Sequence, residues 1–229
     1  LVYGPLNLSS NATGWVNDTW QVPYNAMTGS YKISAIEPDN PGKNDDFTFT
    51  VITRSVDVAV DFSWYKVNEQ VNITGSGFSP NANVTLDIKN SAGVSVATYP
   101  KNVSSNSTGG INYTWTIPPG QTLDNYTVNA TDFNYTNLQN TTTFEVVEAY
   151  SQTDKLKYSN GETVHITGYY WDREVNVTLN VINYTGGSVD SYPKNVSSNA
   201  NGVISDTWIA EAIGLSSTVY NLTAFDALN

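Results

Sequence analysis

Cysteine is absent from this 229-residue chain, and histidine and methionine occur only once each. Without cysteine there are no disulfide bonds, so stability must come from core burial, glycans or other covalent links. The sequence also lacks the common catalytic signatures, among them His-Glu-x-x-His, Gly-x-Ser-x-Gly and a phosphate-binding loop. We therefore predict that the protein is not an enzyme and has no catalytic residues, no cofactor and no metal site.

Charge is scarce as well: charged residues make up 14% of the chain, and the formal net charge is −11. A chain with so few cations cannot neutralise a phosphate backbone, which excludes nucleic acid as a partner. No stretch approaches 18 consecutive apolar residues, so we predict no transmembrane segment. The chain starts at Leu1, which fits either removal of a signal peptide or a fragment of a longer protein.

A long internal repeat is the main feature that is present. The pattern Asn-x-Ser-Ser-Asn-x-x-Gly begins at Asn7, Asn102 and Asn195. Each copy leads into a Thr-Trp pair, and the tryptophans are 95 and then 93 residues apart: Trp20, Trp115 and Trp208. A period near 94 is the length of a domain rather than of a single motif, so the chain is a tandem array of small modules.

Short alternating segments separated by turns predict the fold of one module. In Val71–Thr74 and Asn83–Leu86, apolar and polar residues alternate as they do in half-buried strands. Six or seven such segments and no helical pattern predict all-β, antiparallel Ig-like β-sandwich modules, with Trp115 and Tyr126 in the core. The predicted boundaries are 1–54 for a partial module, 55–148 for a complete one and 149–229 for a third.

The two terminal modules are predicted to be incomplete. The first lacks its early strands, and the third lacks a strand corresponding to Thr143–Val147. An incomplete sandwich leaves apolar core and unpaired backbone groups in water, so something must complete it. Either the chain is a window of a longer array, or copies complete one another head to tail by β-strand donation. In the second case, the alternating residues Phe47, Phe49 and Val51 are the candidate donors.

Asparagine glycosylation motifs are unusually dense. Sixteen asparagines are followed by x-Ser or x-Thr: Asn7, Asn11, Asn17, Asn72, Asn83, Asn102, Asn106, Asn112, Asn125, Asn129, Asn134, Asn140, Asn176, Asn183, Asn195 and Asn221. Strand alternation with Asn and Thr on the solvent face would create such motifs without any sugar. Asparagine is nevertheless a poor strand former, so its repeated use favours N-linked glycans and an extracellular location at the cell surface.

The segment from Val67 to Leu86, VNEQVNITGSGFSPNANVTL, resembles the Ig-like or macroglobulin-like repeats of archaeal and bacterial surface proteins. The cysteine-free, motif-crowded composition is similar to surface glycoproteins of thermoacidophilic archaea, above all to the thread filaments of Sulfolobales. That resemblance implies glycosylated subunits joined by donor-strand complementation. In such an acidic habitat a low charge content is an advantage, because carboxylate ion pairs lose their stabilising effect as pH falls.

We therefore predict a structural subunit of an extracellular, N-glycosylated filament whose partner is another copy of itself. The alternative is an adhesin or S-layer stalk that binds a cell-surface or glycan ligand. Its natural contact patch would be the aromatic run Tyr169–Trp171, which could equally be a seam between modules.

One histidine and one acidic stretch are predicted to be ordinary exposed features of the surface. His165 aligns with Asn72 on the outward face of a strand, which predicts an exposed side chain without a role. The acidic stretch Glu37–Asp46 is predicted to be a solvated loop, although its carboxylates and Asn carbonyls could coordinate Ca²⁺.

Overall fold

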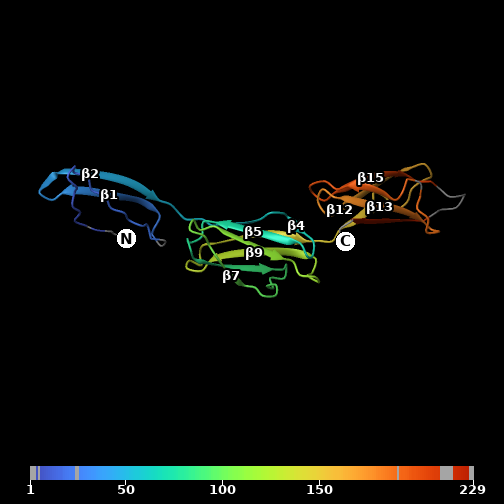
Figure 1. Cartoon of the computed structure of the whole chain (residues 1–229), viewed down its shortest axis with the longest axis horizontal. Helices are drawn as coiled ribbons and strands as arrows, with labels where there is room; N and C mark the ends of the chain where they lie inside the picture. Colours follow the sequence, from blue (N-terminus) through green and yellow to red (C-terminus); the bar gives the residue numbers. More distant parts are fainter. Residues whose placement is uncertain (1–3, 5, 24–25, 190, 212–218, 227–229) are drawn as a thin grey trace. The chain divides into compact units, whose positions relative to one another are not determined.

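The computed structural model describes residues 4, 6–23, 26–189, 191–211 and 219–226. Every regular element in these residues is a β-strand, and all but one of the strand pairings are antiparallel, so the prediction of tandem antiparallel Ig-like β-sandwiches is confirmed. Contacts divide the chain into two compact units, Leu1–Ser55 and Val56–Asn229. Figure 1 shows the strands of both units in sequence colours.

The described residues of the first unit contain a single long hairpin. Strands β1 (Gly29–Glu37) and β2 (Asn40–Val51) pair antiparallel along their whole length. The acidic stretch Glu37–Asp46 lies mostly within β2, so its interpretation as a loop is wrong. Ion pairs of Lys32 with Asp46 and of Lys43 with Glu37 partly compensate the carboxylates across the hairpin.

The middle module has eight strands in two sheets. One sheet has the order β3-β5-β8, and the other has the order β4-β10-β9-β6-β7. Their bounds are β3 (Asp57–Val60), β4 (Trp64–Tyr65), β5 (Gln70–Ser76), β6 (Asn83–Lys89), β7 (Lys101–Ser104), β8 (Ile111–Thr116), β9 (Asp124–Asp132) and β10 (Gln139–Val146). β4 and β7 are short, with two and four residues, so alternation in the sequence predicts neither of them clearly.

Alternation explains the core of this module. On β5, Val71 and Ile73 are fully buried while their neighbours Asn72 and Thr74 are exposed. The same pattern on β6, β8 and β9 directs one face of each sheet inward, and Trp115 and Tyr126 lie in the core as predicted.

The third module repeats this architecture with six described strands. Its sheets have the orders β11-β12-β15 and β14-β13-β16. Their bounds are β11 (Tyr150–Thr153), β12 (Thr163–Tyr169), β13 (Asn176–Asn183), β14 (Lys194–Ser197), β15 (Ile204–Ile209) and β16 (Tyr220–Asp226). By sequence and pairing, β12, β13, β15 and β16 correspond to β5, β6, β8 and β9, and a second apolar cluster forms the core.

Candidate functional site: the strands that close each sandwich

Strand β10 closes the middle module. It pairs with β9 so that Phe144 lies opposite Tyr126, and the two rings stack with their centroids 5.6 Å apart. Phe144 also makes an edge contact with Tyr65 at 5.4 Å and a tilted contact with Trp115 at 6.1 Å. Because Phe144 is 2% exposed and touches aromatic residues from three other strands, it seals this end of the core.

In the third module, the strand that corresponds to β9 has one partner only. β16 pairs with β13, and no other strand in the described part of the chain pairs with its second edge. Its inward residues Tyr220, Leu222 and Ala224 are half-buried, whereas the matching residues of β9 are fully buried. Trp208 is also half-buried, while its counterpart Trp115 is 7% exposed. An unpaired edge with incompletely covered apolar residues is a surface suited to another strand.

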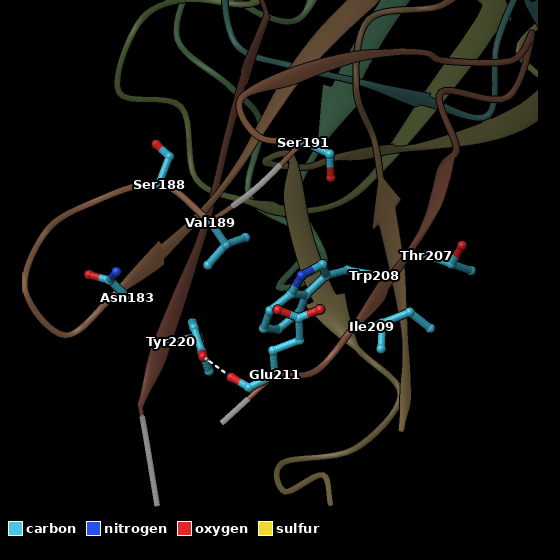
Figure 2. Close-up of a pocket in the computed structure, with 9 residues that line it drawn as sticks. All are labelled: Asn183, Ser188, Val189, Ser191, Thr207, Trp208, Ile209, Glu211 and Tyr220. Carbon is cyan, nitrogen blue, oxygen red and sulfur yellow. Dashed lines mark hydrogen bonds between the residues drawn. The ribbon is translucent and has the colours of Figure 1, made fainter. Parts of the chain in front are cut away.

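A pocket of about 490 Å³ lies between β15 and the connection from β13 to β14, and Tyr220 of β16 forms part of its wall. Figure 2 shows the indole of Trp208 in the middle of the residues that line the pocket, which are Asn183, Ser188, Val189, Ser191, Thr207, Trp208, Ile209, Glu211 and Tyr220. The rings of Trp208 and Tyr220 meet edge to face at 4.8 Å, and the Tyr220 hydroxyl donates to the backbone carbonyl of Glu211. In the middle module the matching aromatic pair is covered by Phe144.

The hairpin of the first unit repeats the closing pair of the middle module. Phe49 on β2 lies opposite Tyr31 on β1, and their rings stack at 5.7 Å, as Phe144 and Tyr126 do. Trp20 makes an edge contact with Phe49 at 5.9 Å, in the place that Trp115 takes beside Phe144. In register and contacts, β1 and β2 are therefore equivalents of β9 and β10.

This hairpin carries an apolar face that little of the first unit covers. Phe47 is 67% exposed, and Ile33 opposite it is 55% exposed. The predicted donor residues Phe47, Phe49 and Val51 lie on this face, as their spacing requires. β2 pairs with β1 and with no other described strand, so the candidate donor is one strand of a hairpin rather than a free segment.

The sixteen candidate glycosylation asparagines all lie within the described residues, and none is buried. Thirteen are exposed, and Asn129, Asn140 and Asn183 are half-buried. Most of those on strands face outward, as Asn72 and Asn125 do. Outward-facing asparagines of this kind fit both N-linked glycans and plain strand alternation.

The aromatic run Tyr169–Trp171 is a seam within the second unit. Trp171 is buried at 6% exposure, and Tyr170 makes an edge contact with Trp64 of the middle module at 5.4 Å. The Arg173 guanidinium lies 3.7 Å from the centroid of the Trp64 ring and donates to the Trp64 carbonyl at 2.8 Å. The expectation of an exposed aromatic contact patch for an adhesin is therefore wrong for Trp171.

An ion pair accompanies these aromatic contacts. Lys66 of the middle module contacts Asp172, and its Nζ lies 3.6 Å from a carboxylate oxygen of Asp226, whose side chain is fully buried. Sequence spacing could not place Lys66 and Asp226 together, because 160 residues separate them. Only the packing of one sandwich on the next brings the two side chains into contact.

The chemistry available elsewhere is limited. His165 is exposed, as predicted, and its backbone N–H donates to Asp154. No cluster of His, Cys, Asp or Glu that could hold a metal ion occurs in the described residues. None of these residues forms a helix that is long and apolar enough to cross a membrane.

No protein family matches the chain, and no curated protein matches it either. Among solved structures, it is similar to a tetra-tandem repeat in the extending region of a large adhesion protein, with 15% identity, a TM-score of 0.33, and coverage of 87% of this chain and 57% of that one. It is also similar to Salmonella alpha-2-macroglobulin reacted with methylamine, with 15% identity, a TM-score of 0.35, and coverage of 74% and 14%.

A third structure, Escherichia coli alpha-2-macroglobulin activated by porcine elastase, has 12% identity, a TM-score of 0.33, and coverage of 87% and 24%. This chain therefore spans only part of the length of each of the three. Similarity at these TM-scores does not indicate a function, so the function must be inferred from the geometry of the chain itself.

Proposed function

We propose that the protein is the structural subunit of an extracellular, N-glycosylated filament, in which β2 of one copy completes the third module of the next. One observation carries the proposal. The β1–β2 hairpin reproduces the Tyr126–Phe144 closing pair with Tyr31 and Phe49, while no described strand of the third module occupies the matching edge of β16.

The geometry of a donated hairpin follows from the middle module. β2 would run antiparallel to β16, as β10 runs to β9. Phe49 would then cover the rings of Trp208 and Tyr220, and Phe47 and Val51 would lie along the same apolar face. Each junction would remove apolar surface from water, at about 25 cal/mol per Å², and would also add backbone hydrogen bonds.

Head-to-tail donation gives a linear polymer because the donor and acceptor are different surfaces, so the contact does not close on itself. The function is then mechanical. Subunits separate only if a sandwich core opens at the junction. The candidate glycosylation asparagines on outward faces support a surface location, since glycans there would leave the inner faces free for packing.

The decisive experiment compares two substitutions on the same strand. Phe49→Asp places a charge on the donor face, and it should leave only single subunits in electron micrographs and light scattering. Thr48→Asp places the same charge on the opposite, exposed face and should polymerise like the parent. Filaments of normal length from Phe49→Asp would refute strand donation by β2.

The acceptor edge is tested separately. Leu222→Asp should also prevent polymerisation, because Leu222 lies on the inward face of β16. Mixing the Phe49→Asp and Leu222→Asp proteins should give dimers, because each retains the surface that the other lacks. If the mixture stays monomeric while each variant folds, the pairing of these two surfaces is wrong.

A further inference from the structure

Asn140 differs in orientation from the candidate glycosylation asparagines of the neighbouring strand β9. On β10 it shares a face with Phe144 and Val146, both of which are buried, so it points toward the opposite sheet. Asn125 and Asn129 on the neighbouring strand β9 lie on the outward face. The sequence motif is the same at all three positions, and only the strand register distinguishes them.

The amide nitrogen of Asn140 links β10 to the beginning of β3. Its Nδ2 donates to the backbone carbonyl of Val56 at 3.1 Å and lies 3.3 Å from the Asp57 carboxylate on β3. Both acceptors can only accept, so the orientation of the amide is unambiguous. Nδ2 thus has one acceptor for each of its two hydrogens, the Val56 carbonyl just before β3 and the Asp57 carboxylate at its start.

Attachment of a sugar would break this link. In N-glycosylation by an activated glycosyl phosphate, carbon C1 of the sugar bonds to Nδ2 and one amide proton is released. The C1–O bond breaks, and its electron pair leaves with the phosphate. A glycosylated Nδ2 keeps one hydrogen, so either the contact to the Val56 carbonyl or the contact to the Asp57 carboxylate is lost.

Asn106 has the opposite arrangement. It begins a tight turn in which its Oδ1 accepts from the backbone N–H of Thr108 at 2.9 Å, the Thr108 hydroxyl at 2.8 Å and the backbone N–H of Gly110 at 2.8 Å. Asn11 and Asn183 begin identical turns, in which Oδ1 likewise accepts three hydrogen bonds. The turn uses only the oxygen of the amide, so Nδ2 can be modified while the turn stays intact.

We infer that the glycosylation motifs divide by which amide atom the fold uses: Asn11, Asn106 and Asn183 carry N-linked glycans, and Asn140 is an unmodified structural residue. The inference rests on the proposed glycosylation and deepens it. Asn72 is an intermediate case. Its Nδ2 makes a single 2.8 Å hydrogen bond to Asp61, and a glycosylated Nδ2 would keep one hydrogen for that bond.

The test is site-resolved mass spectrometry of the full-length protein from cells that N-glycosylate it, combined with matched variants. Peptides with Asn11, Asn106 and Asn183 should carry glycan mass, and the Asn140 peptide should be unmodified. Asn106→Asp should lose the mass of one glycan with little change in melting temperature, because aspartate accepts the same hydrogen bonds. Thr142→Ala, which destroys the motif of Asn140, should leave the glycan mass unchanged.

Asn140→Asp completes the comparison. It should lower the melting temperature without losing glycan mass, since the carboxylate cannot donate to Val56 and repels Asp57. A glycan on Asn140, or a mass decrease in Thr142→Ala, would overturn the inference while leaving the proposed filament intact. Bare asparagines at every motif would overturn the inference and the glycosylated part of the proposed function together.

Discussion

Five turns of this protein share one residue pattern, Asn-x-x-Gly. In each, the glycine has a positive φ between 69° and 85° and its backbone N–H donates to the carbonyl of the asparagine. The turns are residues 11–14, 90–93, 106–109, 183–186 and 199–202. Only three of the asparagines belong to glycosylation motifs, so the turn itself explains why asparagine stands at these positions.

A comparison of Gly109 with Gly93 separates two reasons for a glycine, a positive φ and a lack of space for a Cβ. Both have φ near +78°, where any other residue costs about 1 to 2 kcal/mol. A Cβ on Gly93 would meet nothing within 4 Å, whereas a Cβ on Gly109 would lie 2.0 Å from the carbonyl oxygen of Phe78. We expect Gly109→Ala to destabilise the middle module by about 1 to 3 kcal/mol more than Gly93→Ala does.

Calorimetry of the two variants measures this difference. Equal losses would show that backbone strain alone selects glycine and that the approach of Phe78 has no energetic role.

At the scale of elements, the contact between the middle and third modules explains why Phe62 and Trp64, at and just before β4, are large aromatic residues. Arg173 lies over both Phe62 and Trp64, with distances of 3.9 and 3.7 Å to the ring centroids. The third-module counterparts of these two aromatic residues are Lys155 and Lys157, so the feature belongs to this junction and is not part of the repeat. The junction is therefore a specific joint.

We expect Arg173→Ala to weaken this joint by about 1 to 2 kcal/mol, the usual worth of a partly desolvated cation–π contact. The loss should appear in calorimetry as a lower midpoint of the third-module transition. Lys157→Ala, which removes an exposed cation of the third module, is the matched control and should leave this midpoint unchanged. An unchanged midpoint in Arg173→Ala would show that the Arg173 contact does not stabilise the joint.

At the scale of the whole molecule, the response to acid depends on carboxylates with structural positions, among them Asp132 and Asp61. Burial raises the pKa of Asp132, but hydrogen bonds from Ser79 and from the backbone of Asn134 and Tyr135 outweigh it and hold the pKa below its usual value. Asp61 has the same balance, with burial opposed by hydrogen bonds from Tyr65 and Asn72. Low charge content therefore does not mean that acid has no effect.

The direction of that effect follows from linkage. A carboxyl whose folded pKa is depressed adds stability at pH values above its unfolded pKa of about 4, and this is lost as pH falls through the folded pKa. We expect the free energy of unfolding to be nearly constant from about pH 7 to 5 and to decline below about pH 4. Asp132→Asn should lose about 1 to 3 kcal/mol at neutral pH and show a shallower decline in acid.

Denaturant titrations at several pH values check this, with the exposed Asp39→Asn as the control. A collapse of stability already between pH 5 and 4 would contradict both the low-charge argument and the assignment of these two groups.

Much of the fold was accessible from sequence because burial and exposure alternate on nearly every strand. Val71, Ile73 and Trp115 could be assigned to the core from the sequence, since period-two patterning places them on one face. β4 cannot be predicted in this way because two residues show no period. Glu37–Asp46 looks like a loop in the sequence because charged residues dominate a strand that little of the first unit covers.

The candidate site could be predicted from the sequence only in part. The spacing of Phe47, Phe49 and Val51 predicted their common face, but it could not show that β2 is already one half of a hairpin. Asn140 could not be distinguished from Asn125 by motif, because the direction of each side chain depends on its register against a neighbouring strand.

The sequence by itself determined the all-β modules and their repeat, because local alternation and internal repetition need no knowledge of distant contacts. Only the tertiary structure decided that Lys66 meets Asp226, that Trp171 is buried in a seam and that Asn140 faces the opposite sheet. Those outcomes depend on how sheets and modules pack against one another, and residues far apart in the chain carry no local signal of their contact.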